Sequence, residues 1–264
     1  MPILDIHAHI YPDAIAPKAA ASIGDFYQMP VRYDGTLDVL LKAEAQAGVS
    51  RALVHSVAVT WEKAERINDF IAGAVKAYPG ILTGFATLHP DHPHIGKEID
   101  RAISLGLKGV KLHPDFQHFN IDEEKAFPIY EAMEGRLPLL IHTGDSRYET
   151  SQPKRMARVL DKFPKLQTLC AHLGGWSEWG EAHRVLAGRP NLWVDTSSSL
   201  YAIKPEAARE IILHYGVDRV LFGTDYPMWD PAEELTRLKA LGFGPEEMER
   251  ILYKNAQKLL GEAA

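Results

Sequence analysis

The residues best suited to chemistry are His7 and His9, which end the first apolar run of the chain. Side chains two positions apart in a β-strand point to the same face, so these two imidazoles converge and are suited to hold one divalent cation. A lone pair of this kind is common on protein surfaces and would be weak evidence. Later apolar runs, however, end in the same kind of residue: His113, His142, His172 and, just past Gly223-Thr224, Asp225. Metal-binding side chains therefore recur at one structural position, the far end of a strand.

The composition is that of a globular protein with a large core. Hydrophobic residues make up 46% of the 264 residues, a length that α/β barrels reach as one domain, so we expect a single domain over residues 1–264. The net charge of −6, without a basic cluster, argues against nucleic acid as a partner. The single cysteine, Cys170, excludes an internal disulfide and suits a reducing compartment.

The first apolar run does not look like a targeting signal, because it is short and contains Asp5, His7 and His9. No uncharged apolar stretch of the sequence approaches the roughly 20 residues that span a bilayer. We therefore expect a cytoplasmic protein that acts on a small molecule and does not bind a membrane.

Apolar, β-branched runs alternate with amphipathic segments along the chain. The predicted strands are Ile3–His7, Arg51–Val57, Ile81–Thr87, Leu107–His113, Leu137–His142, Leu166–His172, Asn191–Asp195 and Arg219–Phe222. The predicted helices are Thr36–Ala47, Glu62–Ala77, Ile95–Ser104, Glu123–Glu134, Pro153–Phe163, Ser177–Leu186, Pro205–His214, Pro231–Leu241 and Glu246–Leu260. Several begin at or near proline and are followed by glycine, as helix ends often are.

The order of these elements predicts a (β/α)8 barrel with an extra C-terminal helix. The strands are nearly continuous apolar runs, as in Leu137–Ile141, which is typical of parallel strands covered by helices. A doubly wound open sheet is the alternative. We prefer the barrel because only a closed ring brings the first and last strands together, so that His7 and Asp225 can share a site. The long connection Ile10–Gly35 is expected to be a lid or a pocket wall.

Five segments together resemble the amidohydrolase superfamily. They are Asp5–His9, Gly109–Pro114, Ile141–Gly144, Ala171–Gly175 and Leu221–Pro227. The likeness is greatest to its amidohydrolase-2 branch, which includes aminocarboxymuconate semialdehyde decarboxylase, and it runs from the first predicted strand to the last. The resemblance implies a barrel with a divalent metal, usually Zn²⁺ with Mn²⁺ as the alternative, at the mouth formed by the C-terminal ends of the strands.

The resemblance also assigns roles by position. It makes His7, His9, His142 and Asp225 the metal ligands, and it makes His172 the acid/base. Three imidazoles and one carboxylate suit Zn²⁺ and leave room for a water, whose pKa such an ion lowers to about 7. Asp225 or His172 could then accept the proton of that water.

Lys111 leaves open whether the site holds one metal ion or two. Related binuclear enzymes carry a carboxylated lysine on the fourth strand that bridges two metals. If Lys111 were modified in this way, His142 and His172 would hold the second ion. We favour one ion, because a histidine at the place of His113 in this motif is common in the amidohydrolase-2 branch, whose best-known members look mononuclear.

Three further residues are candidates for substrate binding, each with a structural alternative. His113 could orient substrate at the pocket floor or simply bond to the backbone at a strand end. Arg147 could pair with a substrate carboxylate, although we slightly favour an exposed loop arginine. Trp176 could wall an aromatic or unsaturated substrate or merely pack beneath a loop. His55 has no comparable sequence context, and Asp5 is either an orienting partner or a structural contact.

The reaction we favour from the sequence is hydrolysis of an amide, lactone or related C–X or C–C bond by a metal-activated water. The alternative is non-oxidative decarboxylation of an aromatic or muconate-type acid, for which the same residues would serve. Hydrolysis is preferred because the chain is shorter than typical decarboxylases of this branch and only Arg147 is placed to hold a departing carboxylate. A non-catalytic scaffold is disfavoured because all five segments are intact. Relatives are often dimers, so a homodimer is a further expectation.

Overall fold

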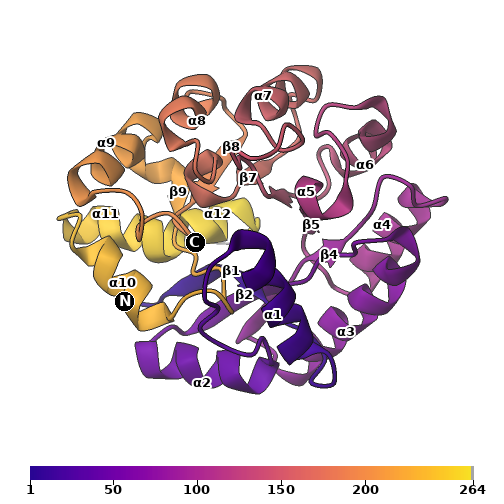
Figure 1. Cartoon of the computed structure of the whole chain (residues 1–264), viewed down its shortest axis with the longest axis horizontal. Coiled ribbons are helices and arrows are strands. Elements are labelled where there is room, and N and C mark those ends of the chain that lie inside the picture. Colours follow the sequence, from indigo (N-terminus) through magenta and orange to yellow (C-terminus); the bar gives the residue numbers. More distant parts are fainter. Residues whose placement is uncertain (263–264) are drawn as a thin grey trace.

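The structure, a computed structural model, describes residues 1–262 and has parallel strands surrounded by helices (Figure 1). One sheet contains β1 (Leu4–His9), β2 (Arg51–His55) and β3 (Leu82–Gly84), in that order. The second contains β4 (Ala86–Thr87), β5 (Val110–Leu112), β6 (Leu139–Ile141), β7 (Thr168–Cys170), β8 (Leu192–Asp195) and β9 (Val220–Leu221). Neighbouring strands pair in parallel throughout.

The two sheets are parts of one closed barrel, which confirms the predicted fold. β3 and β4 are one barrel position interrupted at Phe85, whose backbone N–H donates to Val54 O at 3.0 Å. The ring closes on the other side, where Ile6 N donates to Phe222 O at 3.0 Å and Asp225 N donates to His7 O at 2.8 Å. The sequence therefore encodes eight strand positions, as predicted, although one of them is split.

The helices that cover the barrel lie close to their predicted ranges. They are α2 (Leu37–Ala47), α3 (Ala64–Ala77), α4 (Ile95–Ser104), α6 (Phe127–Met133), α7 (Pro153–Lys162), α8 (Trp179–Leu186), α9 (Pro205–Tyr215) and α10 (Pro231–Lys239). Short 3₁₀ turns lead into α3 at Trp61–Lys63 and into α6 at Glu124–Ala126. Two helices were not predicted: α5 (Pro114–Gln117) and α1 (Ala16–Tyr27), which occupies much of the segment expected to be an irregular connection.

The predicted C-terminal helix is present in three parts. α11 (Pro245–Glu249) continues through a π-helical turn (Arg250–Lys254) into α12 (Asn255–Leu259). Within the turn, Ile251 O accepts a hydrogen bond from Phe222 N at 2.9 Å, and the Asn255 side chain donates to Val220 O at 2.7 Å. This helix therefore fixes the backbone of β9, the strand that leads to Asp225.

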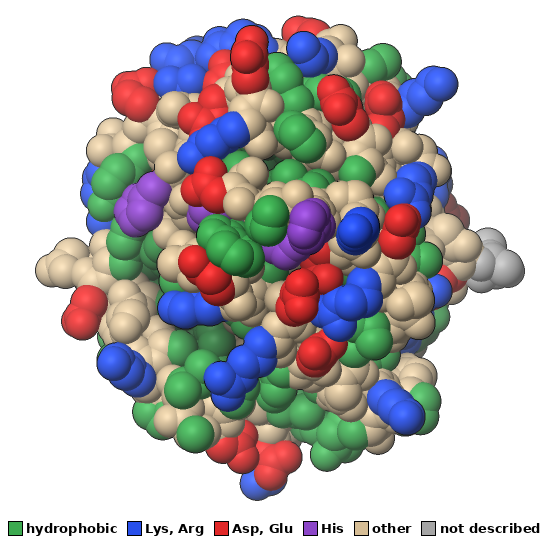
Figure 2. Space-filling model, turned by 90° about the vertical axis from the view of Figure 1, so that its right-hand side faces the viewer, with side chains coloured by type: hydrophobic (Ala, Val, Ile, Leu, Met, Phe, Trp, Pro, Cys, Tyr) green, Lys and Arg blue, Asp and Glu red, His purple; other side chains and the backbone are tan. Residues whose placement is uncertain are grey.

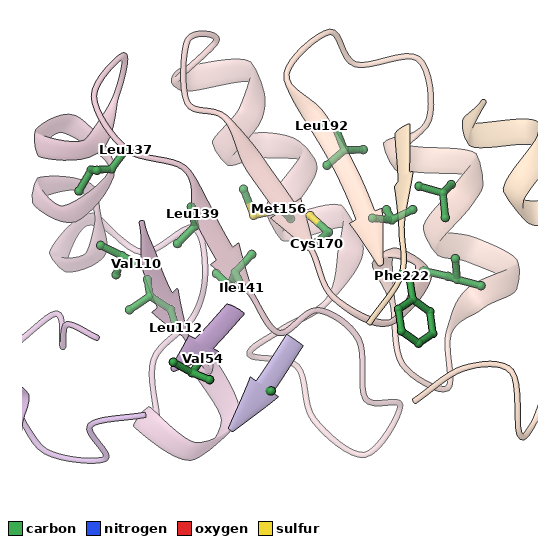
Figure 3. Close-up of a cluster of buried hydrophobic side chains, with 14 of the residues drawn as sticks. Val54, Val110, Leu112, Leu137, Leu139, Ile141, Met156, Cys170, Leu192 and Phe222 are labelled. Carbon is green, nitrogen blue, oxygen red and sulfur yellow. The ribbon is translucent and has the colours of Figure 1, made fainter. Parts of the chain in front are cut away.

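The core has an outer layer between barrel and helices and an inner layer inside the barrel. Leu139 and Ile141 belong to the outer layer (Figure 3). Leu140, between them in the sequence, belongs to the inner layer. Both faces of β6 are therefore buried, which explains its continuous apolar sequence. Cys170 lies in the outer layer with no exposed surface, and burial raises the pKa of its thiol, as expected of an inert apolar filler.

The molecular surface carries both signs of charge. Acidic and basic side chains are interspersed on the face in Figure 2. Some form ion pairs, such as Arg136 with Asp100 and Arg189 with Asp161. Pairs this exposed contribute little stability individually. Among residues 1–262, no helix has both the length and the apolar character needed to cross a membrane.

The carboxyl groups of Asp5, in β1, and Glu44, in α2, are both buried and lie side by side. Asp5 accepts hydrogen bonds from His7 N at 2.9 Å and from Thr224 N at 3.0 Å, so it is a structural link between the first strand and the last. The Glu44 side chain of α2 lies beside Asp5, and its two oxygens receive no hydrogen bond from any N–H or hydroxyl donor. Burial raises the pKa of Asp5 to about 6 and raises that of Glu44 well above its ordinary value. One proton held between the two carboxyls relieves their repulsion.

We predict that Glu44→Gln makes the stability of the metal-free protein less dependent on pH. The folded state binds the carboxyl proton more tightly than the unfolded state, so the free energy of unfolding falls as pH rises through the raised pKa values. The fall begins near pH 4, the ordinary pKa of a carboxyl, and is on the order of 1–3 kcal/mol by about pH 7, and the variant should lose the share that Glu44 contributes. Urea unfolding at several pH values measures this. The exposed Asp38→Asn in the same helix is the control, and equal slopes in both variants would contradict the prediction.

Candidate metal centre

The first and last strands bring predicted ligands together at the C-terminal end of the barrel. His7 Nε2 lies 3.3 Å from Asp225 Oδ1, and His9 Nε2 lies 3.5 Å from the same oxygen. The other oxygen, Oδ2, accepts a hydrogen bond from Ser198 Oγ at 2.5 Å. Asp225, 218 residues after His7 in the sequence, thus lies beside both histidines of the His-x-His pair, as the barrel prediction requires.

His142 and His172 form a second contact beside the first group. His172 Nε2 lies 3.0 Å from His142 Nδ1, and the rings of His172 and His7 are 5.2 Å apart. These two nitrogens are the pair that the two-metal alternative assigns to a second ion. Among the described residues, mutually close donor groups are formed by His7, His9 and His55 and by His7, His172 and Asp195, and His142 belongs to neither. The predicted ligands are therefore neighbours, but His142 faces His172 rather than the His-x-His pair.

Lys111 lies at the centre of the cluster. Its side chain is fully buried, and its Nζ lies 3.1 Å from His7 Nε2. Burial lowers the pKa of its amine to about 8, against the opposing effect of the carboxylates of Asp225 and Asp195, so about a tenth of it is uncharged at pH 7. The position of Lys111 is compatible with a modified lysine, and its carboxylation stays the alternative to the one-ion site that the sequence favours.

Asp195 is a site residue that the sequence analysis did not identify. Its Oδ2 lies 2.9 Å from His7 Nδ1, and its Oδ1 accepts from His172 N at 3.0 Å. A carboxylate on one ring nitrogen holds the imidazole in place and leaves the other nitrogen free for a metal. The signal was available, because Asp195 ends a predicted strand as the other candidates do.

His55 was also missed. Its ring lies 5.0 Å from that of His7 and 4.4 Å from that of His9, and it has no exposed surface. The predicted second strand ran to Val57, which placed His55 inside the strand. The observed strand ends at His55 and pairs it with His9. An error of two residues at a strand end thus concealed a residue of the cluster.

Burial keeps the imidazoles of the cluster neutral. It lowers the pKa of His9 to about 3 and lowers those of His7, His55 and His142 well below the ordinary value, assisted by the nearby charge of Lys111. Neutral imidazole is the form that binds metals. Unpartnered buried nitrogens remain on His9, His55 and His142. Such atoms are rare in folded proteins, and a cation would satisfy them, so the residues fit a divalent metal ion.

The predicted substrate-binding residues His113, Arg147 and Trp176 all lie close to Tyr27. His113 Nε2 is 2.9 Å from the Tyr27 hydroxyl, and the His113 ring stacks on His142 at 4.0 Å. Trp176 meets Tyr27 edge to face at 5.0 Å. Arg147 is already paired: its Nη2 lies 2.7 Å from Oδ2 of the buried Asp145. Of the three, only Trp176 lines the cavity described next. The charge of Arg147 is neutralised by Asp145.

A cavity of about 10 Å³, room for roughly one water molecule, opens between these groups. It is lined by Tyr27, Met29, His142, His172, Trp176, Ser198, Tyr201, Asp225, Met228 and Trp229. Tyr27 and Met29 come from the segment Ile10–Gly35, which therefore supplies a wall of the cavity, as expected. A larger open groove of about 600 Å³ lies on the far side of α1, but no residue of the histidine cluster lines it, so we place the substrate in the smaller cavity.

Several residues around the cavity have left-handed backbone conformations. The φ angles are 61° for both His172 and Asp225, 45° for Ser198 and 106° for Asp145. For residues with a Cβ such conformations cost on the order of 1–3 kcal/mol each and persist only where surrounding contacts hold them. For Asp225 those contacts are the backbone bond to His7 and the hydrogen bond from Ser198. These conformations lower the folding stability, and they set the directions in which the four side chains point.

Comparison with known proteins places the chain in a family. The sequence model of the amidohydrolase family matches residues 4–261. Gamma-resorcylate decarboxylase of Polaromonas sp. strain JS666 is 24% identical over 314 aligned positions, which cover 96% of this chain and 92% of that protein. 2-Amino-3-carboxymuconate-6-semialdehyde decarboxylase of Dictyostelium discoideum is also 24% identical, over 75% of this chain and 66% of that protein.

Solved structures share the fold over nearly the whole chain. A TIM-barrel protein of Bordetella bronchiseptica has a TM-score of 0.81 at 23% identity and covers 99% of both chains. 5-Carboxyvanillate decarboxylase of Sphingomonas paucimobilis has a TM-score of 0.78 at 18% identity and the same coverage. Dihydroxybenzoic acid decarboxylase of Polaromonas sp. JS666, solved with bound manganese and the inhibitor 2-nitroresorcinol, has a TM-score of 0.74 at 19% identity and covers 98% of this chain and 97% of that chain.

These comparisons overturn the preference for hydrolysis. Both sequence relatives, and two of the three structures above, are decarboxylases, so the hydrolase hypothesis favoured from the sequence is wrong and its alternative fits better. The chain is shorter than gamma-resorcylate decarboxylase, since the 314 aligned positions exceed its 264 residues, but the alignment spans 92% of that protein, so a shorter chain does not argue against decarboxylation. The argument that only Arg147 is placed to hold a departing carboxylate fails because a divalent cation can supply that positive charge.

We predict that Asp195→Asn weakens metal binding by about 10- to 100-fold without unfolding the protein, because the amide no longer fixes His7 with a negative charge. The amide oxygen can still accept from His172 N, so the fold should survive. Chelator-competition titration with Zn²⁺ and Mn²⁺ measures the affinity, and circular dichroism reports the fold. Asp218→Asn, a largely exposed carboxylate, is the control. Unchanged affinity in Asp195→Asn would contradict the orienting role.

Proposed function

The chain belongs to the amidohydrolase family, and from that premise we propose that it is a metal-dependent decarboxylase of a small aromatic carboxylic acid. The observation that carries the proposal is the arrangement of the cavity. His172 and Asp225 border it on one side, and Tyr27, Trp176 and Trp229 form its walls. Polar groups that can handle a proton therefore face aromatic surfaces that favour stacking on a planar ring.

The residues that would hold the metal ion are His7, His9 and Asp225. The resemblance adds His142, whose Nδ1 faces His172 in the structure. A divalent cation held there supplies the positive charge that binds the substrate carboxylate and stabilises negative charge on its ring. The donors suit Zn²⁺, and the manganese in one decarboxylase of the same fold makes Mn²⁺ an equal candidate. We propose one ion, with the Lys111, His142 and His172 group as the place for a second.

The chain itself positions the substrate and limits water. The charge of Arg147 is satisfied by Asp145, and its Nη1 donates to Phe26 O at 2.7 Å. Arg147 therefore anchors the C-terminal end of α1, which carries Tyr27 over the cavity, and its proposed role changes from binding the carboxylate to holding this wall. The cavity has room for about one water with Tyr27 and Trp176 placed as they are, so a substrate ring would have to move these side chains apart, and it would then fill the space that a nucleophilic water needs.

The proton that decarboxylation requires is handled by Asp225 and His172. In a non-oxidative decarboxylation, the carbon that bears the carboxylate accepts a proton, and the electron pair of the broken carbon–carbon bond returns to the ring as carbon dioxide leaves. Asp225 Oδ2 and the ring of His172 are held by Ser198 Oγ and by Ser197 Oγ at 2.5 Å and 2.9 Å. We assign delivery of the proton to this pair, which is protonated again from solvent.

We expect the protein loaded with Zn²⁺ or Mn²⁺ to release carbon dioxide from a hydroxybenzoate or a muconate-type acid. A panel of such acids, with esters and lactones beside them, tests the proposal by measuring both carbon dioxide and titratable acid. Asp225→Asn should lower kcat by at least about 100-fold while the fold survives, because a residue at the barrel mouth contributes chemistry more than packing. Release of acid from an ester or lactone without carbon dioxide would sink the decarboxylase proposal.

His172→Asn tests the number of metal ions. With one ion the variant should lose turnover but keep its metal, because His172 acts on the proton. With two ions it should lose about half of the metal, because His172 then holds the second ion with His142. Elemental analysis after gel filtration gives the stoichiometry, and His183→Asn on α8, outside the cluster, is the control. A half-loaded variant would refute our preference for one ion.

A further inference from the structure

We propose that the hydroxyl of Tyr27 donates a hydrogen bond to an oxygen atom of the substrate, and that His113 sets the direction of this bond. The inference rests on the proposed function, since it concerns how the same cavity recognises a small aromatic acid. Tyr27 comes from α1, outside the strand ends that carry the candidate metal ligands, and its role leaves those ligands unchanged.

The helix that follows His113 decides which of its ring nitrogens carries the proton. His113 precedes α5, and its Nδ1 accepts a hydrogen bond from Phe116 N at 3.4 Å, as the residue that caps a helix often does. A ring nitrogen that accepts a hydrogen bond carries no proton, so the ring of His113 is neutral. Because a neutral imidazole has one N–H, the hydrogen-bond network assigns the proton to Nε2.

Tyr27 is therefore the acceptor in its hydrogen bond with His113. The Tyr27 oxygen lies 2.9 Å from His113 Nε2, and the N–H at Nε2 donates to it. Burial raises the pKa of Tyr27 well above its ordinary value, so the hydroxyl keeps its own proton. Among residues 1–262 this hydroxyl has no second hydrogen-bond partner. The O–H of Tyr27 is thus a donor that the protein itself does not use.

This unused donor belongs to a side chain that lines the cavity. Tyr27 and His142 both border the cavity, and the ring of His142 is stacked on that of His113 at 4.0 Å. Asp225, a candidate metal ligand, borders it as well, so an acid that fills the cavity meets both the cation and Tyr27. A hydroxybenzoate offers two kinds of acceptor to an O–H donor, the carboxylate and the hydroxyl oxygen of the ring.

Tyr27 is held in place independently of a substrate. The guanidinium carbon of Arg147 lies 5.5 Å from the centre of the Tyr27 ring, and the ring of Phe116 is 6.0 Å away. Displacement of Trp176 alone would admit a ring and leave the Tyr27 hydroxyl bonded to His113. A donor that is already oriented costs little ordering when the substrate binds, so it adds to both affinity and selectivity.

The test measures binding of two acids of similar shape to the Zn²⁺-loaded full chain by titration calorimetry. 2-Hydroxybenzoate carries an acceptor oxygen on the ring, and 2-methylbenzoate has a methyl group in its place. We expect Tyr27→Phe, which removes only the hydroxyl, to weaken binding of 2-hydroxybenzoate by about 10-fold. Loss for this acid alone identifies the ring oxygen as the acceptor, and equal loss for both acids identifies the carboxylate. Tyr148→Phe, whose side chain does not line the cavity, is the control and should bind both acids normally.

Two substitutions of His113 test the direction of the bond. In His113→Gln the side-chain amide can still donate to the Tyr27 oxygen, so binding of 2-hydroxybenzoate should stay within about threefold of the wild type. In His113→Leu the hydroxyl loses the partner that orients it, and the affinity should fall by about 10-fold. If Tyr27 instead donated to His113, the leucine would release the donor and the affinity would rise. Zinc analysis of each variant shows that the metal content is unchanged.

The outcomes separate this inference from the proposed function. Normal binding of both acids by a folded Tyr27→Phe would overturn the inference, as would a rise in affinity in His113→Leu. If Tyr27→Phe fails to fold by circular dichroism, His113→Leu decides: a loss of affinity supports the inference, and unchanged affinity refutes it. Absence of binding by the Zn²⁺-loaded wild type would overturn the inference together with the placement of the substrate in this cavity. Normal binding without release of carbon dioxide would count only against the proposed reaction.

Discussion

The contact between the first strand and the segment after the last strand is the constraint on which the site depends. Backbone bonds from Asp225 N to His7 O and from His9 N to Tyr226 O join the two ends of the barrel, at 2.8 Å and 2.7 Å. The same bonds hold Asp225 in its left-handed conformation and bring its carboxylate to the His-x-His pair. Ile251, in the π-helical turn, accepts a hydrogen bond from Phe222 N directly after β9. The C-terminal helix therefore supports the site although it supplies none of its side chains. Closure of the barrel and assembly of the metal centre are therefore one event.

A second constraint is the burial of so many nitrogen atoms at one place. His7, His9, His55 and Lys111 are all buried, and burial disfavours protonation of each. Neutral imidazoles do not repel one another, but their unprotonated ring nitrogens then have lone pairs that need a hydrogen-bond donor or a cation. Some are satisfied by the protein, as His7 Nδ1 is by Asp195. Others, namely His9 Nδ1 and both ring nitrogens of His55, are buried without a hydrogen-bond partner, and a cation explains this better than core packing does.

The sequence was sufficient for the fold and for most of the metal-facing residues, because both depend on periodic patterns. Strand ends could be located to within a few residues, and histidines at those ends had to meet once the ring closed. The same uncertainty of a few residues concealed His55, since its strand ends two residues earlier than predicted. Contacts such as that between Asp195 and His7, 188 residues apart, depend on which nitrogen of a ring faces which strand, and no local pattern contains this information. Helix α1 was missed because the whole segment Ile10–Gly35, rich in Pro, Ala and aromatic residues, was interpreted as one long connection.

The walls of the cavity, rather than the candidate metal ligands, favour the proposed decarboxylation over hydrolysis. A cation held by imidazoles and a carboxylate activates water or a substrate carboxylate equally well, so the residues that end the strands could not decide between the reactions. The wall formed by Tyr27 is different, because it is fixed by Arg147, which joins buried Asp145 to Phe26 O in α1. This link keeps the space beside His172 and Asp225 narrow and lined with aromatic side chains. In such a space a planar acid would exclude the water that competes with proton transfer to carbon, so the cavity suits the proposed decarboxylation better than hydrolysis.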